Sequence, residues 1–502
     1  MTTEPRLITG GLLLAGAGAE ARAADVLIEG GKIAAIEAPG SIDPSRGRAL
    51  DATDRMLVPG LVNGHTHGHG ALTKGLVGDR APLEVFLTGS VAVTGNRTLE
   101  DKRLAARLTA VELIRRGCTT AFDLFVEYPA PSAEGIGAVA EAYDEVGMRA
   151  VVAPMMADRT LYEALPGLLD SLPEPYRAKA EAMRAAPTEV SLDAARAILE
   201  GWQHDRDRIR PAVAPTIPLH CSDDFMVGCA RLSQEHDCAL QTHLAETKTQ
   251  NLLGQTRYGR SLTAHLEALG LLSPRFSAAH GIWLDLEDMK RIGGAGGAVI
   301  HNPMSNLRLG SGVAKARELK EAGVCLGIGT DATNTSDGQN MFEALRLASY
   351  LSRICDADRS RWITSDEAFE AATVGSAQAL GFSHLGRLEP GWGADIVFLD
   401  LGHITYMPLR RPLLQMVFAE SGAALRSVMV AGRMVLEDGR LLTVDEVRLR
   451  AEAEEAAARL DGQNAEAIRA SDAMADLVGC FCLAQSRHHA GCVRTLWEAE
   501  GA

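Results

Sequence analysis

Short apolar segments alternate with amphipathic stretches through the middle of the chain, and this alternation predicts parallel βα units. Apolar residues recur with a helical period in three clear stretches, Arg103–Arg116, Leu192–Trp202 and Val313–Ala322. The candidate strands are Leu57–Val62, Thr119–Leu124, Arg149–Pro154, Pro211–Ala214, Ala239–His243, Phe276–His280, Ala298–His301 and Val324–Thr330. No glycine-rich phosphate loop follows the first strand, so the pattern favours a (β/α)8 barrel of the TIM type over an open sheet, across residues 58–386.

Both flanks of this region carry a different pattern, in which short apolar runs are interrupted by glycine. Asp25–Ile36 contains two apolar runs around a Gly-Gly pair, which predicts a strand, a turn and a second strand. Ser427–Leu436 repeats the pattern near the other end. We therefore expect residues 1–57 and 387–443 to pair into one small composite β domain of the sandwich type.

The two termini suggest a helical extension and no export signal. Residues 444–470 are rich in Ala, Glu and Arg, which favours a C-terminal helical extension over 444–502. Leu7–Ala17 is mostly apolar and superficially resembles the core of a secretory signal. Glu4 and the single Arg6 are a poor start for such a signal, so we expect a cytoplasmic protein.

Composition and charge narrow the range of partners. The 502 residues include 50 basic and 65 acidic ones, for a net charge of −15, and 46% are hydrophobic. An acidic chain is a poor ligand for nucleic acid or an anionic membrane, and no stretch approaches the ~20 apolar residues of a membrane span. The nine cysteines form no CxxC pair, which indicates reduced thiols. We therefore expect a small-molecule substrate.

Histidines and one aspartate cluster at the predicted strand ends. His65 and His67 stand two residues apart after the first barrel strand, so both side chains face the same side. Two neutral imidazoles suit a divalent cation such as zinc or iron, although an isolated His-x-His is more often structural. His243, His280 and Asp331 end the fifth, sixth and eighth strands. Barrel active sites form at the carboxyl ends of the strands, so these residues together predict a metal site.

The sequences around these residues are distinctive: Pro59–His67 (PGLVNGHTH), Thr242–Thr247 (THLAET), Ala278–Gly281 (AAHG), His301–Asn306 (HNPMSN) and Gly327–Ala332 (GIGTDA). With these motifs the chain resembles the amidohydrolase superfamily, in the branch of cytosine, guanine and S-adenosylhomocysteine deaminases and triazine hydrolases. Gly386–Val397 is similar to the segment that re-enters the small β domain of that family. The resemblance covers residues 7 to 440 and implies a distorted (β/α)8 barrel with a composite β domain.

The resemblance also implies how the metal is held. Binuclear members of the superfamily bridge two ions with a lysine on the fourth strand, but no lysine lies between Lys102 and Lys179 or in the candidate strand at 211–214. A single divalent ion per chain is therefore expected, zinc first and iron as the alternative. Its implied ligands are His65, His67, His243 and Asp331.

Three residues are implied to be catalytic. Asp331 would bind the ion and accept the proton of a water that the cation has activated. Glu246, three residues after His243, stands where the family has its proton shuttle, although an acid there could also be a solvated residue at a helix start. His280 would stabilise the tetrahedral intermediate or orient the attacking oxygen.

Other residues are candidates for substrate contact. His69 could bind substrate or be an ordinary loop residue, and the segment after the seventh strand offers His301, Asn302 and Asn306, which packing of the turn could also explain. The segment after His67 is long and charged, with the positions Lys74, Asp79, Arg80 and Glu84. Such a loop can form a lid or a substrate wall, or it can simply be solvated.

The leading function hypothesis is hydrolytic deamination of an amino-substituted nitrogen heterocycle of the purine, pterin or pyrimidine type. The alternative keeps the same site for an s-triazine, urea or carbamate C–N bond, or a C–Cl bond. The sequence after the barrel aspartate, Ala332–Asp337, departs from the deaminases, and Ala332 stands directly after the aspartate, where a triazine chlorohydrolase is expected to have asparagine. A non-catalytic scaffold would not need all these residues. The resemblance also implies a homo-oligomer.

Overall fold

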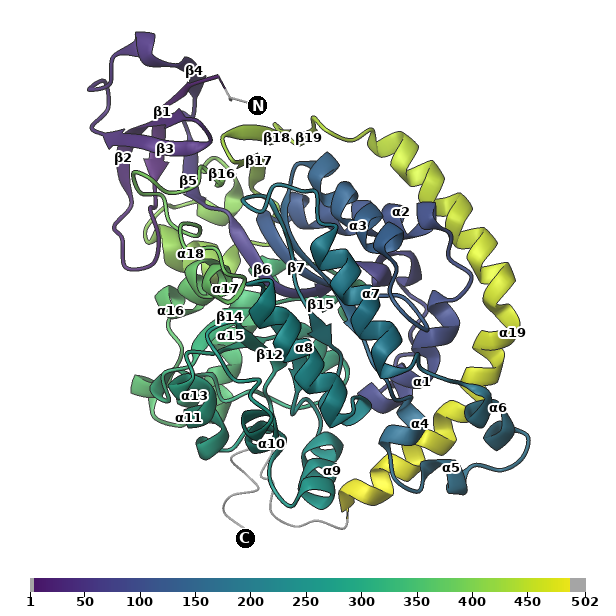
Figure 1. The fold of residues 1–502 in the computed structure, drawn as a ribbon. Coiled ribbons are helices and arrows are strands. Elements are labelled where there is room, and N and C mark those ends of the chain that lie inside the picture. The colour runs from purple at the N-terminus through teal and green to yellow at the C-terminus, as the bar shows by residue number, and fades with distance from the viewer. Residues whose placement is uncertain (1–3, 488–502) are drawn as a thin grey trace.

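The computed structural model describes residues 4–487 and contains a β domain, a barrel of βα units and a long C-terminal helix (Figure 1). The helices of the first half of the barrel are α1 (Leu83–Thr94), α2 (Leu99–Arg115), α3 (Ala133–Val146), α4 (Leu161–Ala164), α5 (Leu168–Ser171), α6 (Tyr176–Ala182), α7 (Thr188–Glu200) and α8 (Asp223–Glu235). Those of the second half are α9 (Lys248–Tyr258), α10 (Leu262–Ala268), α11 (Leu286–Gly294), α12 (Pro303–Arg308), α13 (Ala316–Glu321), α14 (Thr333–Ser336), α15 (Met341–Cys355), α16 (Ser365–Glu370) and α17 (Ser376–Ala379).

The β domain is built from strands of both ends of the chain. Its strands are β1 (Arg6–Leu13), β2 (Arg22–Glu29), β3 (Lys32–Glu37), β4 (Arg48–Asp51), β5 (Arg55–Pro59), β16 (Ile396–Asp400), β17 (Leu425–Val430), β18 (Arg433–Glu437) and β19 (Arg440–Leu441). They form one sheet in the order β19-β18-β17-β16-β5-β1-β2-β3, with β4 on β1, and helix α18 (Pro412–Ala419) connects β16 to β17. Apolar residues of both halves share one core cluster, so the sheet folds over itself like a sandwich.

Parallel strands form the barrel around the middle of the molecule. The first sheet has the order β10-β8-β7-β6-β15 with β9 on β8, and the second has the order β11-β12-β13-β14. Their bounds are β6 (Leu61–His67), β7 (Cys118–Val126), β8 (Arg149–Met156), β9 (Ile209–Pro211), β10 (Ala214–Pro215), β11 (Leu240–Leu244), β12 (Phe276–His280), β13 (Ala298–His301), β14 (Cys325–Ile328) and β15 (Asp331–Ala332). A parallel bridge between Val213 and Leu240 joins the sheets on one side, and the chain passes directly from β14 to β15 on the other.

Three of the candidate strands differ from the observed ones. The segment Leu57–Val62 is divided at Gly60, where a β-carbon would come within 2.2 Å of Thr119 Oγ1. Strand β5 therefore ends in the β domain, and β6 begins the barrel. The fourth strand is divided into β9 and β10 at Ala212 and Val213, although both N–H groups donate to neighbouring segments, at Val152 and Ala239. The eighth is divided into β14 and β15, and Asp331 has a φ of 61° at that point.

The C-terminal extension is one helix, α19 (Glu446–Arg487), which runs along the outside of the barrel (Figure 1). It lies against α1, and its far end packs on the α4–α6 segment through Met474, Val478 and Cys482. The last part of the predicted extension, residues 488–502, lies outside the described residues. In the described part, no helix is long and apolar enough to cross a membrane.

Candidate metal centre

The predicted ligands come together at the carboxyl ends of the barrel strands. His65 and His67 lie in β6, His243 in β11, and Asp331 begins β15. All four side chains are buried. Strand β6 is buried along its whole length, as expected of a parallel strand covered on both faces. This is the end of a barrel where loops assemble active sites.

Each histidine ring is anchored through its Nδ1 atom. Nδ1 of His65 lies 2.6 Å from Gln241 Oε1, and that of His67 lies 2.7 Å from the Leu124 carbonyl oxygen. In the same way, Nδ1 of His243 lies 2.6 Å from the carbonyl oxygen of Thr216. Because these oxygens can only accept, Nδ1 is the donor, and the lone pair of each ring is on Nε2.

The three Nε2 atoms and the Asp331 carboxylate converge on one point. Nε2 of His67 lies 3.1 Å from Nε2 of His243 and 3.3 Å from Asp331 Oδ1, and Nε2 of His65 lies 3.6 Å from the same oxygen. Two groups of possible ligand atoms, His65–His243–His280 and His65–His67–Asp331, fall within 4.8 Å. Two lone pairs at 3.1 Å beside a carboxylate repel one another unless a cation lies between them. The donor set therefore fits a divalent cation.

Several buried polar atoms around this point have no hydrogen-bond partner among the described residues. They are Nε2 of His65, Nε2 of His280 and Oε1 of Glu246. Buried polar atoms are normally paired, and those that are not mark an ion, a water or a ligand position. These three belong to residues that the sequence predicts for the site. Asn334, whose Oδ1 is also unpaired beside the cavity, is not among the predicted residues.

The backbone at the site is strained. His280 has a φ of 71° and Asp331 has a φ of 61°, and neither residue is a glycine. A left-handed conformation at such residues persists only where the surrounding structure holds it, and it is frequent at functional sites. Here it turns the two side chains toward the carboxyl ends of the strands.

Burial controls the charge of the histidines and of Glu246. Burial lowers the pKa of His67 and of His280 to about 4, so both rings are neutral at pH 7. Burial raises the pKa of Glu246 well above its ordinary value, and the charges of Asp331 and Glu84 act in the same direction. At Asp331 burial would also raise the pKa, but the hydrogen bond with His65 and the electrostatic interaction with the His280 and His67 rings outweigh it and hold that pKa well below its usual range.

Glu246 lies in the loop between β11 and α9. Its side chain is 1% exposed, its Oε2 lies 3.6 Å from His280 Nε2, and its N–H donates to Gln250 Oε1 at 2.9 Å. Thr247, not Glu246, caps the following helix. The alternative of a solvated acid at a helix start is therefore wrong for this residue.

The turn after β13 lies behind His280 and Asp331. Nδ1 of His280 lies 2.8 Å from Asn306 Oδ1, and Ser305 Oγ donates to Asp331 Oδ2 at 2.5 Å. Asn302 and His301 are fully buried in the same turn. None of the three predicted substrate contacts in this turn, His301, Asn302 and Asn306, lies among the described residues that line the cavity, because the turn folds beneath His280.

A cavity of about 100 Å³ opens beside the converging ligands. Among the predicted substrate contacts, His69 lines it. The His69 ring accepts the Val126 N–H at Nδ1 (3.3 Å) and packs edge-on against Phe125. The charged segment after His67 is not a loop throughout: it becomes helix α1, in which Glu84 is buried and accepts a hydrogen bond from Thr247 Oγ1 at 2.7 Å.

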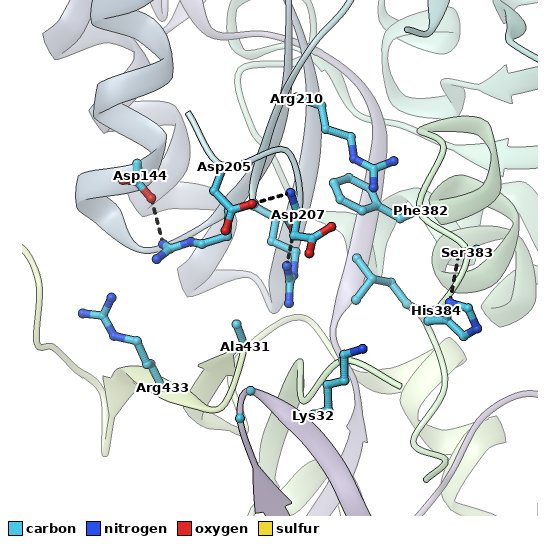
Figure 2. Close-up of a pocket in the computed structure, with 16 residues that line it drawn as sticks. Lys32, Asp144, Asp205, Asp207, Arg210, Phe382, Ser383, His384, Ala431 and Arg433 are labelled. Carbon is cyan, nitrogen blue, oxygen red and sulfur yellow. Dashed lines mark hydrogen bonds and ion pairs between the residues drawn. The ribbon is translucent and has the colours of Figure 1, made fainter. Parts of the chain in front are cut away.

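A second and larger cleft, of about 580 Å³, lies between the β domain and the amino ends of β8 and β9 (Figure 2). Its charged residues are mostly engaged within the protein. Arg208 pairs with Asp144 at 3.0 Å, and Arg149 pairs with Asp395 at 3.0 Å. Arg210 lies over the ring of Phe382. We call this the charged cleft.

Sequence reasoning missed Gln241 and the helix α1. Gln241 stands two residues before His243, on the same side of β11, and this spacing is the only signal that could have pointed to it. Its Nε2 donates to the Gly64 carbonyl oxygen at 3.2 Å and to Ser277 Oγ at 2.9 Å, so its Oε1 faces His65. Apolar residues at helical spacing could have revealed α1 within the charged segment.

Comparison with known proteins agrees with this geometry. The model of the amidohydrolase family matches residues 56–435. A 5-methylthioadenosine/S-adenosylhomocysteine deaminase from Pyrococcus abyssi is 31% identical over 88% of this chain and 96% of its own length. An 8-oxoguanine deaminase from Pseudomonas aeruginosa is 33% identical over 84% of this chain and 92% of its own.

A solved structure has the same fold. It is an adenosine deaminase from Xanthomonas campestris with bound zinc, which is 26% identical and superposes with a TM-score of 0.80 over 91% of this chain and 98% of that one. The distorted barrel with a small β domain is thus confirmed as the fold class. By the extent of the family match and of its relatives, the chain belongs to the amidohydrolase family.

Proposed function

We propose that this protein is a metal-dependent deaminase that hydrolyses an exocyclic C–N bond of an amino-substituted nitrogen heterocycle. The observation that carries the proposal is the set of anchored histidines around Asp331, with the buried Glu246 beside it. The relatives support the reaction, because their names describe deaminases of adenosine-like and guanine-like compounds.

The cation would be held by His65, His67, His243 and Asp331, one ion per chain. Zinc is the first candidate and iron the second, since imidazole and carboxylate accept both. A divalent cation at this position supplies Lewis acidity, which makes water a nucleophile at neutral pH. The anchoring of each Nδ1 atom presents Nε2 to the ion and fixes the ring orientation.

The protein's own residues would carry the protons. Asp331 accepts a proton from the attacking water while the water oxygen bonds to the ring carbon that bears the amino group. His280, with Nδ1 held by Asn306, offers Nε2 to the attacking water and orients it. We propose that Asn306 contributes indirectly, because it holds the ring of His280 in place.

Glu246 would act as the acid. Burial raises its pKa and so favours the protonated form, which can donate a proton to the adjacent ring nitrogen as the C–O bond forms. The proton that Asp331 holds then passes to the amino group. The C–N bond breaks and ammonia leaves. The hydroxyl group left on the ring carbon returns its proton to Glu246, so the ring keeps a carbonyl oxygen and Glu246 is protonated again. His69 lines the cavity and is proposed as a substrate contact.

Ammonia release tests this proposal. Protein purified without chelators is assayed for its metal content and then incubated with aminopurines, aminopterins, aminopyrimidines and aminotriazines. We expect about one zinc or iron per chain and ammonia from at least one ring class. If alkylamine, chloride or carbonate is released instead and ammonia never is, the deaminase assignment is wrong. We also propose that the protein is cytoplasmic and that it forms a homo-oligomer. Cell fractionation tests the first proposal, and light scattering tests the second.

A further inference from the structure

One face of helix α1 forms a wall of the cavity at the metal centre. Its residues at helical spacing that line the cavity are Leu83, Phe86, Leu87, Ser90, Val91 and Thr94. Val91 remains 37% exposed, and Phe86 and Leu87 are half-buried, so this apolar face is not covered by the protein itself. The opposite wall adds Val126, Met155, Ile217 and Leu309.

The cavity contains no charge outside the metal centre. Glu246 and Asp331 are the only Asp, Glu, Lys or Arg residues among the described residues that line it. A charged substituent on the substrate would therefore enter an apolar wall without an opposite charge, which is strongly unfavourable.

Four hydroxyl groups of the wall already donate to backbone oxygens. Ser90 Oγ donates to the Leu87 carbonyl oxygen at 3.0 Å, and Thr94 Oγ1 donates to that of Ser90 at 2.8 Å. Thr335 Oγ1 donates to the Ala332 carbonyl oxygen at 2.8 Å, and the Tyr128 hydroxyl donates to the Arg184 carbonyl oxygen. Two uncharged polar residues of the lining differ: Asn334 Oδ1 has no partner among the described residues, and His69 accepts at Nδ1, so its proton is on Nε2.

Helix α19 holds this wall in place from behind. Gly479 of α19 lies against Val85, where a β-carbon would come within 3.2 Å of the valine side chain. Asn464 of α19 accepts a hydrogen bond from Asn96 Nδ2 at 2.8 Å and donates one to the Gly95 carbonyl oxygen at 3.1 Å. The wall is thus supported along its length, and the cavity of about 100 Å³ is smaller than the ~300 Å³ at which pockets for drug-sized ligands begin.

We propose that the cavity selects a compact heterocycle whose remaining substituents are uncharged, such as short alkyl groups. This inference rests on the proposed function, because it describes the non-reacting part of the same substrate. It separates this chain's substrate from nucleosides with a zwitterionic or phosphorylated tail.

Matched ligands test the inference by binding alone. Zinc-loaded full-length protein is titrated with an adenine, a diaminotriazine and an aminopyrimidine, each bearing an ethyl, a carboxymethyl or a 2-aminoethyl group. The readout is the ligand-dependent shift in Tm, converted to Kd. We expect the ethyl member to bind at least ~10-fold more tightly than both charged members in every series that binds. The carboxylate of the carboxymethyl ligand can coordinate zinc, which would hide an unfavourable effect of its charge. The 2-aminoethyl ligand has no carboxylate, so it tests the effect of a charge without this coordination.

A charge placed on the wall should reverse the preference. In the Val91→Lys variant we expect the carboxymethyl ligand to gain at least ~10-fold relative to the ethyl ligand. Val447→Lys makes the same change on α19, at a residue that is 83% exposed and outside the cavity, and should leave the preference unchanged.

Two results would overturn the inference: a charged member that binds the native protein as tightly as its ethyl partner, or no binding by any ethyl member. Its failure is distinguishable from that of the proposed function. Ethyl ligands that bind without ammonia release would contradict the deaminase and leave the inference standing. Ammonia released mainly from charged substrates would support the deaminase and contradict the inference about the cavity.

Discussion

The cavity at the metal centre and the charged cleft differ in almost every property. The charged cleft is the larger, about 580 Å³ against about 100 Å³, and it has many more charged residues. Three of its arginines, Arg149, Arg208 and Arg210, contact carboxylates, a carbonyl oxygen or an aromatic ring. Buried atoms without partners gather at the metal-centre cavity beside an apolar wall, on His280, Glu246 and Asn334. Among the described residues that line the charged cleft, Nε of Arg208 is one such atom.

The difference shows that neither volume nor charge identifies the site. Paired charges at a solvent-open surface contribute little to binding, because water and salt screen them. Unpaired polar atoms inside a protein cost free energy, so a group of them around one point indicates a position where something binds. The following predictions test this distinction, from the largest expected effect to the smallest.

Removal of one ligand should abolish the metal centre. In His65→Ala we expect loss of the bound ion and a decrease in kcat/KM of more than ~10³-fold, since the remaining donors no longer surround the cation. Metal analysis and ammonia release measure the two effects. The matched control is His384→Ala, which removes an exposed histidine of the charged cleft. If this control loses metal or activity to the same extent, the contrast between the two regions fails.

Loss of the acid should affect chemistry without loss of metal. In Glu246→Gln we expect kcat to fall by ~10²- to 10⁴-fold while the metal content is unchanged. Glu246 loses its proton as pH rises through its raised pKa. The activity of the native enzyme should therefore decline above that pKa. The variant should lack this decline. Retention of native kcat in the variant would exclude Glu246 as the proton donor.

Loss of the partner behind His65 should weaken metal binding more moderately. Gln241→Leu keeps the size of the side chain but removes the oxygen that accepts from His65 Nδ1. Such changes typically weaken metal binding ~10- to 100-fold. Competition with a chelator measures the affinity. Gln378→Leu, a change of the same kind on α17, is the control that should leave it unchanged.

The smallest effect concerns the buried acid of α1. Burial raises the pKa of Glu84 above its ordinary value of 4.5, so folding favours the protonated form. The contribution of protonated Glu84 to the free energy of unfolding is fully present below pH 4.5 and is lost as pH rises through the raised pKa. Glu84→Gln should therefore become more stable than the native chain as pH rises, by about 1.4 kcal/mol for each unit of the shift. Thermal unfolding from pH 4 to 8, with the exposed Glu455→Gln as control, measures it.

The sequence was sufficient to predict the barrel and the placement of the ligands at strand ends. Strands have a period of two and barrel strands are parallel, so His65, His67, His243 and Asp331 could be located from local patterns alone. The structure brings all four together, although their binding of a metal is still a proposal.

Other features depend on contacts between distant segments, which local patterns do not contain. Glu84 has the sequence context of a solvated loop, and its burial requires Thr247 and helix α19 to cover it. The roles of Gln241 and Asn306 depend on which atoms of neighbouring strands face them. The interruption at Gly60 likewise follows from packing against a neighbouring strand, at Thr119.

The pairing of β5 with β16 has a consequence for the synthesis of the chain. Strand β5 ends at Pro59, and its antiparallel partner begins only at Ile396. A growing chain emerges at roughly 5–20 residues per second, so the edge of β5 stays without this partner for tens of seconds. An unpaired edge of that kind is where nascent chains aggregate. The ribosome-bound intermediate is thus the stage at which a chaperone would protect this protein.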